Sequence, residues 1–270
     1  MHQPRVVRAG QGPPIVFVHG SATDHTTWSI QLASRLRERF ELVTYDRRNT
    51  ATVEDQAADL AGVIGGSRPI VVGSSFGAVI ALELARSHRA LCRALVLIEP
   101  PMAPSDGPLD GIAVARAAAG GEPEAPNRAR ARFLEEFDRT AAESGGPAAG
   151  EFFLRTVLGD AAFSKVPRMF LERSKAKWAE IRADSVALMA YRPRYAELGA
   201  IDVPVLLLGG GQSAPSFRVT LDALAAALPR ARLEIIARAG HMLHAEAPSR
   251  FIELISGFAE EVGLRNNEAM

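Results

Sequence analysis

A G-x-S-x-G pentapeptide with its flanking residues constrains this chain more than any other stretch. The apolar run Ile70–Val72 predicts the end of a buried strand, and Ala78–Ala85 has the pattern of a helix. Between them lie Gly73, Ser75 and Gly77. In a strand–turn–helix context this pattern predicts a nucleophile elbow, a tight turn that presents the serine hydroxyl. The alternative is an ordinary Gly-Ser turn, because the bare pentapeptide also occurs by chance.

The segments around the pentapeptide alternate between strand and helix patterns. The predicted elements are strands at Ile15–Val18, Leu42–Tyr45 and Leu95–Ile98, and helices at Trp28–Arg39 and from Thr52 to about Ile64. This order is typical of a parallel sheet with helices on both faces. The carboxyl ends of parallel strands share one edge, where reactive residues collect. Ser75, Glu99 and the turn after Val18 should therefore meet there.

The alternation stops after Glu99 and resumes at the strand Val205–Leu208, roughly a hundred residues later. A structureless loop of that length is uncommon in a compact domain, and helical patterns occupy its second half. These patterns lie in Arg128–Ala142, Ala148–Leu158 and Met169–Leu188. We expect a core domain formed by residues 1–101 and 201–270 and a helical cap formed by residues 102–200. The alternative is a peripheral helical insertion unrelated to the site.

The last part of the chain returns to the core pattern. It predicts a helix at Ser216–Leu228, a strand at Leu233–Ile236 and a helix that begins at Pro248. A loop containing Gly240 and His241 lies between the last two.

Composition excludes several classes of function. Basic and acidic residues both number 31 and no basic run stands out, which argues against a nucleic-acid partner. Neither a leader peptide nor an apolar stretch long enough to span a membrane is visible, so we expect no membrane partner. The single cysteine, Cys92, cannot form an internal disulfide, and we expect its side chain to be buried. A chain without disulfides is typical of a reducing compartment, so we expect a cytoplasmic protein.

Four motifs in order resemble the α/β-hydrolase superfamily: His19-Gly20, Tyr45-Asp46-Arg47-Arg48, Gly73–Gly77 and Gly240-His241. The resemblance covers nearly the whole chain and is weak only in the middle. It implies an α/β fold with an eight-stranded, mostly parallel sheet, helices on both faces, and a helical cap inserted between strands 6 and 7.

The resemblance also implies roles for individual residues. A serine hydroxyl needs a base to become a nucleophile, and His241 holds the position of that base beside Ser75. The backbone N–H groups of Phe76 and Ser21 are the expected oxyanion donors. The alternatives are a structural loop histidine at 241 and a simple turn at Ser21. Four other histidines are expected outside the triad: His19 as a loop-bracing residue, His25 in the lining of the pocket, His88 at the negative end of its helix dipole, and His244 in packing or support.

The acid departs from the usual pattern of the superfamily. The family usually carries an aspartate after the seventh strand, but Gln212 stands there and cannot stabilise a protonated base. Glu99 follows the preceding strand, as in certain haloalkane dehalogenases and the zearalenone-type lactonases. We therefore predict the triad Ser75–His241–Glu99. A dyad, or an acid at Asp202 or Asp222, is the alternative.

The predicted activity is hydrolysis of a carboxylic ester or lactone through an acyl-enzyme, with neither a metal nor an organic cofactor. Apolar residues in the cap suggest a hydrophobic small-molecule substrate, although each is more typical of a cap core: Phe133, Phe137, Met169, Phe170, Trp178 and Met189. The same triad can run acyl transfer, perhydrolysis, macrocyclisation or carbon–carbon bond hydrolysis. A ligand-binding protein without catalysis is a further alternative, since a fold alone does not choose among these.

Overall fold

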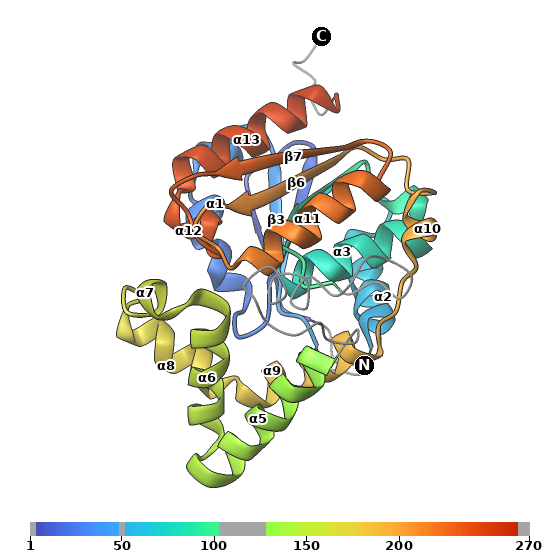
Figure 1. Ribbon diagram of the computed structural model, residues 1–270. Coiled ribbons are helices and arrows are strands. Elements are labelled where there is room, and N and C mark those ends of the chain that lie inside the picture. Colours follow the sequence, from blue (N-terminus) through green and yellow to red (C-terminus); the bar gives the residue numbers. More distant parts are fainter. Residues whose placement is uncertain (1–3, 49–51, 103–127, 264–270) are drawn as a thin grey trace.

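A seven-stranded sheet forms the centre of the computed structural model, which describes residues 4–48, 52–102 and 128–263 (Figure 1). The strands are β1 (Val6–Ala9), β2 (Pro14–Val18), β3 (Glu41–Tyr45), β4 (Ile70–Ser74), β5 (Ala94–Ile98), β6 (Val205–Gly210) and β7 (Ala231–Ile236). They lie in the order β1-β3-β2-β4-β5-β6-β7, and only β1 runs antiparallel to its neighbour.

The expected count of eight strands is too high by one for the described residues. A single strand, β1, precedes β2, so each later strand takes a number one lower than expected. The insertion therefore lies between β5 and β6, which is the same place in the chain as predicted. The architecture is otherwise as the resemblance implies, with a mostly parallel sheet covered by helices.

Alternating side chains of the sheet pack into two separate apolar cores, one on each face. In β2, Val16 and Val18 belong to one apolar cluster, whereas Ile15 and Phe17 belong to the other. This alternation follows from the period of two in a strand. One face is covered by α2 (Val53–Ile64), α3 (Phe76–Ser87) and α11 (Pro215–Ala227), and the other by α1 (Ser29–Leu32) and α13 (Pro248–Glu261).

Short segments complete the core. They are η1 (His25–Trp28), η2 (Arg35–Glu38), η3 (Arg89–Leu91), α10 (Tyr195–Leu198) and α12 (Leu243–Glu246). The helix expected over Trp28–Arg39 is wrong, because that stretch forms η1, α1 and η2 in succession. Ser34 explains the break: its hydroxyl accepts the N–H of Leu36 and donates to the carbonyl of Gln31, which caps a new turn.

Five inserted helices gather on one side of the molecule, apart from the sheet (Figure 1). They are α5 (Arg128–Ser144), α6 (Gly146–Leu158), α7 (Asp160–Phe163), α8 (Arg168–Ala176) and α9 (Trp178–Ala190). They share an apolar cluster around Phe137 and Ile181, which also includes Ala22 from the turn after β2. The helix expected over Met169–Leu188 ends at Lys177 and restarts at Trp178, whose indole packs on Gly146. The Ala-, Gly- and Pro-rich start of the insertion, 103–127, lies outside the described residues.

Across the described parts of the chain, each helix is too short or too polar to cross a bilayer.

Candidate active site

Ser75 lies at the tip of the turn between β4 and α3. Its backbone has φ 53° and ψ −121°, a left-handed conformation that L-residues rarely adopt. Such a strained turn places the serine hydroxyl at the carboxyl edge of the sheet. The two glycines are required by close approach: a Cβ on Gly73 would lie 2.3 Å from the carbonyl oxygen of Gly77, and one on Gly77 would lie 2.3 Å from that of Val18.

The turn after β2 lies directly against the elbow. A Cβ on Gly20 would lie 3.0 Å from the carbonyl oxygen of Ser74 and 3.1 Å from the Cβ of Ser75. On the other side, the N–H of Ser75 donates to the carbonyl of Ile98 at 2.8 Å. Ser75 therefore sits between the residues that follow β2 and those that follow β5.

His241 and Glu99 are joined by a buried hydrogen bond. The distance from His241 Nδ1 to Glu99 Oε2 is 2.6 Å, and the two side chains are 5% and 1% exposed. The second carboxylate oxygen, Oε1, accepts the N–H of Gly210 at 2.7 Å. Glu99 itself has φ 42°, a strained conformation for a non-glycine residue. With Nδ1 engaged, Nε2 is the nitrogen that His241 can turn to a substrate or a serine.

No hydrogen bond joins the Ser75 hydroxyl to His241 in the part of the chain that the structure describes. Catalytic hydrogen bonds of this kind are often long or poorly aligned until substrate binds. The His241 ring is held by Phe217 of α11, which stacks on it at a centroid distance of 4.4 Å and an interplanar angle of 19°. An aromatic face is a favourable neighbour for a ring that gains positive charge.

The loop that carries His241 is braced by Glu246 from α12. Its carboxylate accepts the N–H of Gly240 at 2.8 Å and the N–H of Met242 at 3.1 Å. One charged side chain thus binds the N–H groups of the two residues that flank His241. Sequence reasoning missed both Glu246 and Phe217. The glutamate five residues after the histidine, on the same short loop, was the available signal.

Ser21 and Phe76 lie on the two sides of the Ser75 turn. Neither backbone N–H has an acceptor among the described residues, as an oxyanion donor requires. The Ser21 hydroxyl donates to Asp184 Oδ2 at 2.7 Å. Asp184 belongs to α9 and forms a buried ion pair with Arg47, which follows β3. Sequence analysis gave neither of these two charged residues a role.

The alternative acids and the residue at the family's usual acid position lie elsewhere. Asp222 pairs with Arg218 on the exposed face of α11, and Asp202 is exposed. Neither forms a hydrogen bond with His241. Gln212 is exposed as well, and its backbone N–H donates to Ala239. Of the carboxylates considered from the sequence, Glu99 is the one that contacts His241.

The remaining histidines have separate structural partners. His19 is buried and His25 contacts Asp46 at 2.7 Å, while His88 is exposed at the end of α3. His244 is buried, lies 4.5 Å from the Trp28 ring and contacts Thr27 Oγ1 at 3.2 Å. Burial lowers the pKa of both His19 and His244 to about 3, so both are neutral at ordinary pH. Cys92 is buried just before β5, and burial raises the pKa of its thiol to about 11.

A group of potential metal ligands, Asp24, His25 and Asp46, lies near the turn after β2, with ligand atoms within 4.8 Å of one another. Internal hydrogen bonds account for it: Asp24 Oδ1 accepts from Thr26, and His25 Nδ1 contacts Asp46 Oδ1.

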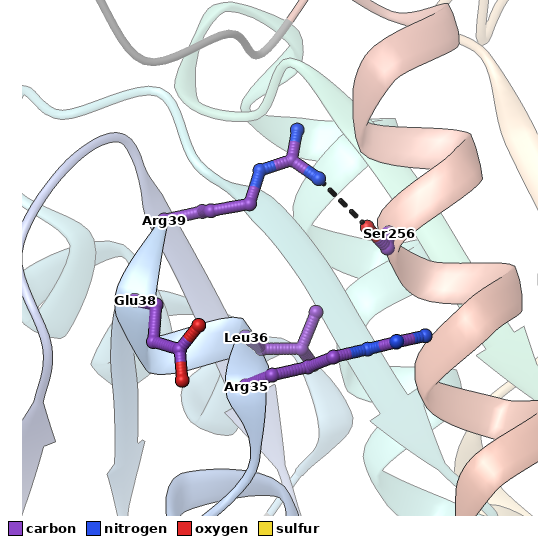
Figure 2. A pocket seen from close by; sticks show the side chains of 5 residues that line it. All are labelled: Arg35, Leu36, Glu38, Arg39 and Ser256. Carbon is purple, nitrogen blue, oxygen red and sulfur yellow. Dashed lines mark hydrogen bonds between the residues drawn. The ribbon is translucent and has the colours of Figure 1, made fainter.

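A hollow of about 310 Å³ lies on the surface between η2 and α13, and Ser75, His241 and Glu99 are not part of its lining. Figure 2 shows that Arg39 crosses it toward Ser256, 3.0 Å away. Its lining consists of Arg35, Leu36, Glu38, Arg39 and Ser256.

Comparison with known proteins identifies the family of the chain. A model of the Alpha/beta hydrolase family matches residues 15–254, which is most of the chain. This chain belongs to the α/β hydrolase family. No curated protein sequence matches it significantly.

Solved structures similar to this chain include an esterase, an enol-lactonase and MenH. A thermophilic esterase from Thermogutta terrifontis has 25% identity and a TM-score of 0.73, with 96% of this chain and 93% of that one covered. The enol-lactonase from Burkholderia xenovorans LB400 has 19% identity and a TM-score of 0.73, with 95% and 96% covered. MenH from S. aureus has 17% identity and a TM-score of 0.75, with 97% and 99% covered. The last two are too distant to show more than a shared fold.

Proposed function

We propose that this protein is a serine hydrolase that cleaves the carboxylic ester or lactone bond of a hydrophobic small molecule. The observation that carries the proposal is the 2.6 Å contact between His241 and Glu99 beside a serine held at φ 53°. A base fixed by a buried carboxylate at the same sheet edge as a half-buried serine is the arrangement that acyl transfer through serine needs. The similarity to an esterase at 25% identity supports the same class of reaction.

The mechanism follows from the atoms that remain available. Ser75 Oγ attacks the carbonyl carbon while His241 Nε2 takes its proton, and the N–H groups of Phe76 and Ser21 hold the oxygen that becomes negative. Glu99 keeps the Nδ1 proton in place and stabilises the imidazolium. His241 then returns the proton to the leaving oxygen, and water hydrolyses the acyl-enzyme by the reverse sequence.

The proposal includes a division into a core, residues 1–101 and 201–270, and a cap, residues 102–200. Its support is the apolar cluster that joins the inserted helices, of which Ala22 is the one buried member from the core, whereas Ala187 and Tyr191 of the insertion pack into a core cluster. Ion pairs of Arg47 with Asp184 and of Asp24 with Arg173 connect the two parts.

The substrate's hydrophobic character has less support. Phe137 is buried inside the inserted helices and Phe133 packs on three other phenylalanines, so neither argues for an apolar pocket. Met169 and Phe170 are exposed on α8.

A serine-reactive fluorophosphonate tests the proposal. It should label Ser75 stoichiometrically, and Ser75→Ala should lose labelling together with hydrolysis of p-nitrophenyl esters and aliphatic lactones of graded chain length. Ser74→Ala is the matched control, because Ser74 is the buried neighbour in β4 and should keep activity. Absence of labelling in the folded wild type would favour a binding protein. Transfer to an added alcohol or peroxide in place of water would favour an acyltransferase or perhydrolase.

A further inference from the structure

The peptide between Gly20 and Ser21 is held from three sides through its carbonyl oxygen. Gly20 O accepts from His19 Nδ1 at 2.9 Å, from Thr23 Oγ1 at 3.0 Å and from Arg47 Nη2 at 3.2 Å. The tautomer of His19 is settled by its other nitrogen, which accepts the N–H of Arg47 at 3.1 Å, so Nδ1 carries the proton. A trans peptide is planar, so fixing this carbonyl also fixes the opposite direction of the Ser21 N–H.

Arg47 touches both halves of the proposed oxyanion site. Besides bonding Gly20 O, its guanidinium lies 4.8 Å from the centre of the Phe76 ring. Its Nη1 also donates to Gln56 at 2.5 Å. Phe76 and the Gly20–Ser21 peptide supply the two proposed N–H donors. One buried guanidinium therefore contacts the residues that carry both donors.

Asp184 holds Arg47 in this position from the inserted helices. Its two carboxylate oxygens accept from Arg47 Nη1 at 3.2 Å and Nη2 at 2.8 Å, and Oδ2 also accepts the Ser21 hydroxyl. The side chains of Arg47 and Asp184 are 3% and 2% exposed, so the pair is shielded from water. A bidentate ion pair of this kind fixes the orientation of the guanidinium plane as well as the position of its charge.

We infer that Arg47 and Asp184 are positioning residues that set the direction of the Ser21 N–H for oxyanion binding. Since Asp184 lies on α9, this part of the catalytic site is complete only when the inserted helices are docked on the core. The inference rests on the proposed function and assigns to that site two residues that touch no reacting atom.

Asp184→Asn tests the inference, because it keeps the size of the side chain and removes its charge. We expect kcat for ester hydrolysis to fall by about 10- to 100-fold, less than the full loss of an oxyanion donor, with KM within about twofold of wild type. The Ser21 amide signal in a ¹H–¹⁵N spectrum should shift. Asp138→Asn is the matched control, since Asp138 forms a two-pronged pair with Arg182 on the exposed side of the inserted helices. It should leave kcat and the Ser21 amide unchanged.

A merely structural ion pair gives a different result: a lower melting temperature, with kcat and the Ser21 amide signal as in wild type. That outcome would overturn the inference.

Thr23→Val keeps the inference testable if Asp184→Asn does not fold. It removes one donor to Gly20 O without touching the ion pair, and should lower kcat by about three- to tenfold and shift the Ser21 amide. A wild-type kcat together with a wild-type Ser21 amide signal in Thr23→Val would contradict the inference. If the fluorophosphonate did not label Ser75 in the wild-type protein, that result would contradict the proposed function alone. The Ser21 amide signal would still report whether Asp184 orients the Gly20–Ser21 peptide.

Discussion

The two sides of Ser75 are supported by different parts of the molecule. On one side, His241 is held by Glu99, Phe217 and Glu246, which all come from the core. On the other side, the Gly20–Ser21 peptide depends on Arg47, which depends in turn on Asp184 from the inserted helices. If the proposed roles hold, proton transfer is supported by the core alone, whereas oxyanion binding also requires the docked insertion. Variants that affect one side only can test this separation.

The largest expected effect is on the core side, from Glu99→Gln. Glutamine can still accept the N–H of Gly210 but cannot stabilise a protonated His241, so kcat should fall by roughly 10³- to 10⁴-fold. Steady-state kinetics on an ester measures the loss. Glu253→Gln, which alters an exposed pair with Arg250, should have no effect. Near-wild-type activity of Glu99→Gln, with loss in Asp202→Asn or Asp222→Asn, would move the acid to one of those residues.

Lowering the pH should reduce the stability of the folded protein through both sides, because each contains a buried neutral histidine. These are His19 on the Gly20–Ser21 side and His244 on the His241 side. The pKa of His19 is lowered to about 3 by burial and by the charge of Arg47, and that of His244 to about 3 by burial. Between pH 6.5 and 3 the unfolded chain binds protons that the native chain does not, so stability falls as pH drops.

Urea unfolding at pH 7.5 and pH 5 measures this dependence. Each histidine should remove about 2 kcal/mol from the free energy of unfolding over that interval. His244→Phe should roughly halve the loss. His88→Phe, at an exposed site, should leave it unchanged, and an equal pH dependence in both variants would contradict the assignment.

A smaller effect is expected from Glu246→Gln, which keeps one acceptor for the two N–H groups that flank His241. The imidazole should lose orientation, and kcat should fall by about tenfold with little change in KM. The Ser21 amide signal should stay as in wild type, because Glu246 belongs to the core side. A shift of that signal would show that the two sides are coupled.

The smallest effect is expected from Gln212→Asp, which places a carboxylate where the family usually has one. On the proposed assignment Glu99 already supplies the acid, so activity should change by less than about threefold. A large gain in kcat would mean that Glu99 leaves His241 poorly supported.

Local patterns predicted much of the fold. The elbow and α2 begin at the expected residues because their signals are short-range: the Thr52 hydroxyl accepts the N–H of Asp55, as a capping residue should. The helix expected over Trp28–Arg39 failed because the competing hydrogen bonds of Ser34 outweigh the apolar spacing. The strand count was taken from the family and is one too high for the described residues.

The site was predictable where strand ends determine it. Glu99 and His241 are 142 residues apart in sequence. The end of a parallel strand led us to expect Glu99 at the edge where Ser75 lies, and the family resemblance placed His241 there. Their catalytic roles, the cytoplasmic location and the substrate class stay predictions. Asp184 could not be predicted, because it lies within an ordinary helical pattern and its partner Arg47 is 137 residues away.

Glu99 at the end of β5 also has a consequence for engineering. On the proposed assignment the loop after β6, where Gln212 is exposed, does not supply the acid, and the N–H that Glu99 accepts comes from Gly210 at the end of β6. Residues grafted between Gln212 and Ser213 would lie close to the loop that carries His241, because the Gln212 N–H donates to Ala239. That loop is therefore the natural place to install new selectivity by directed evolution.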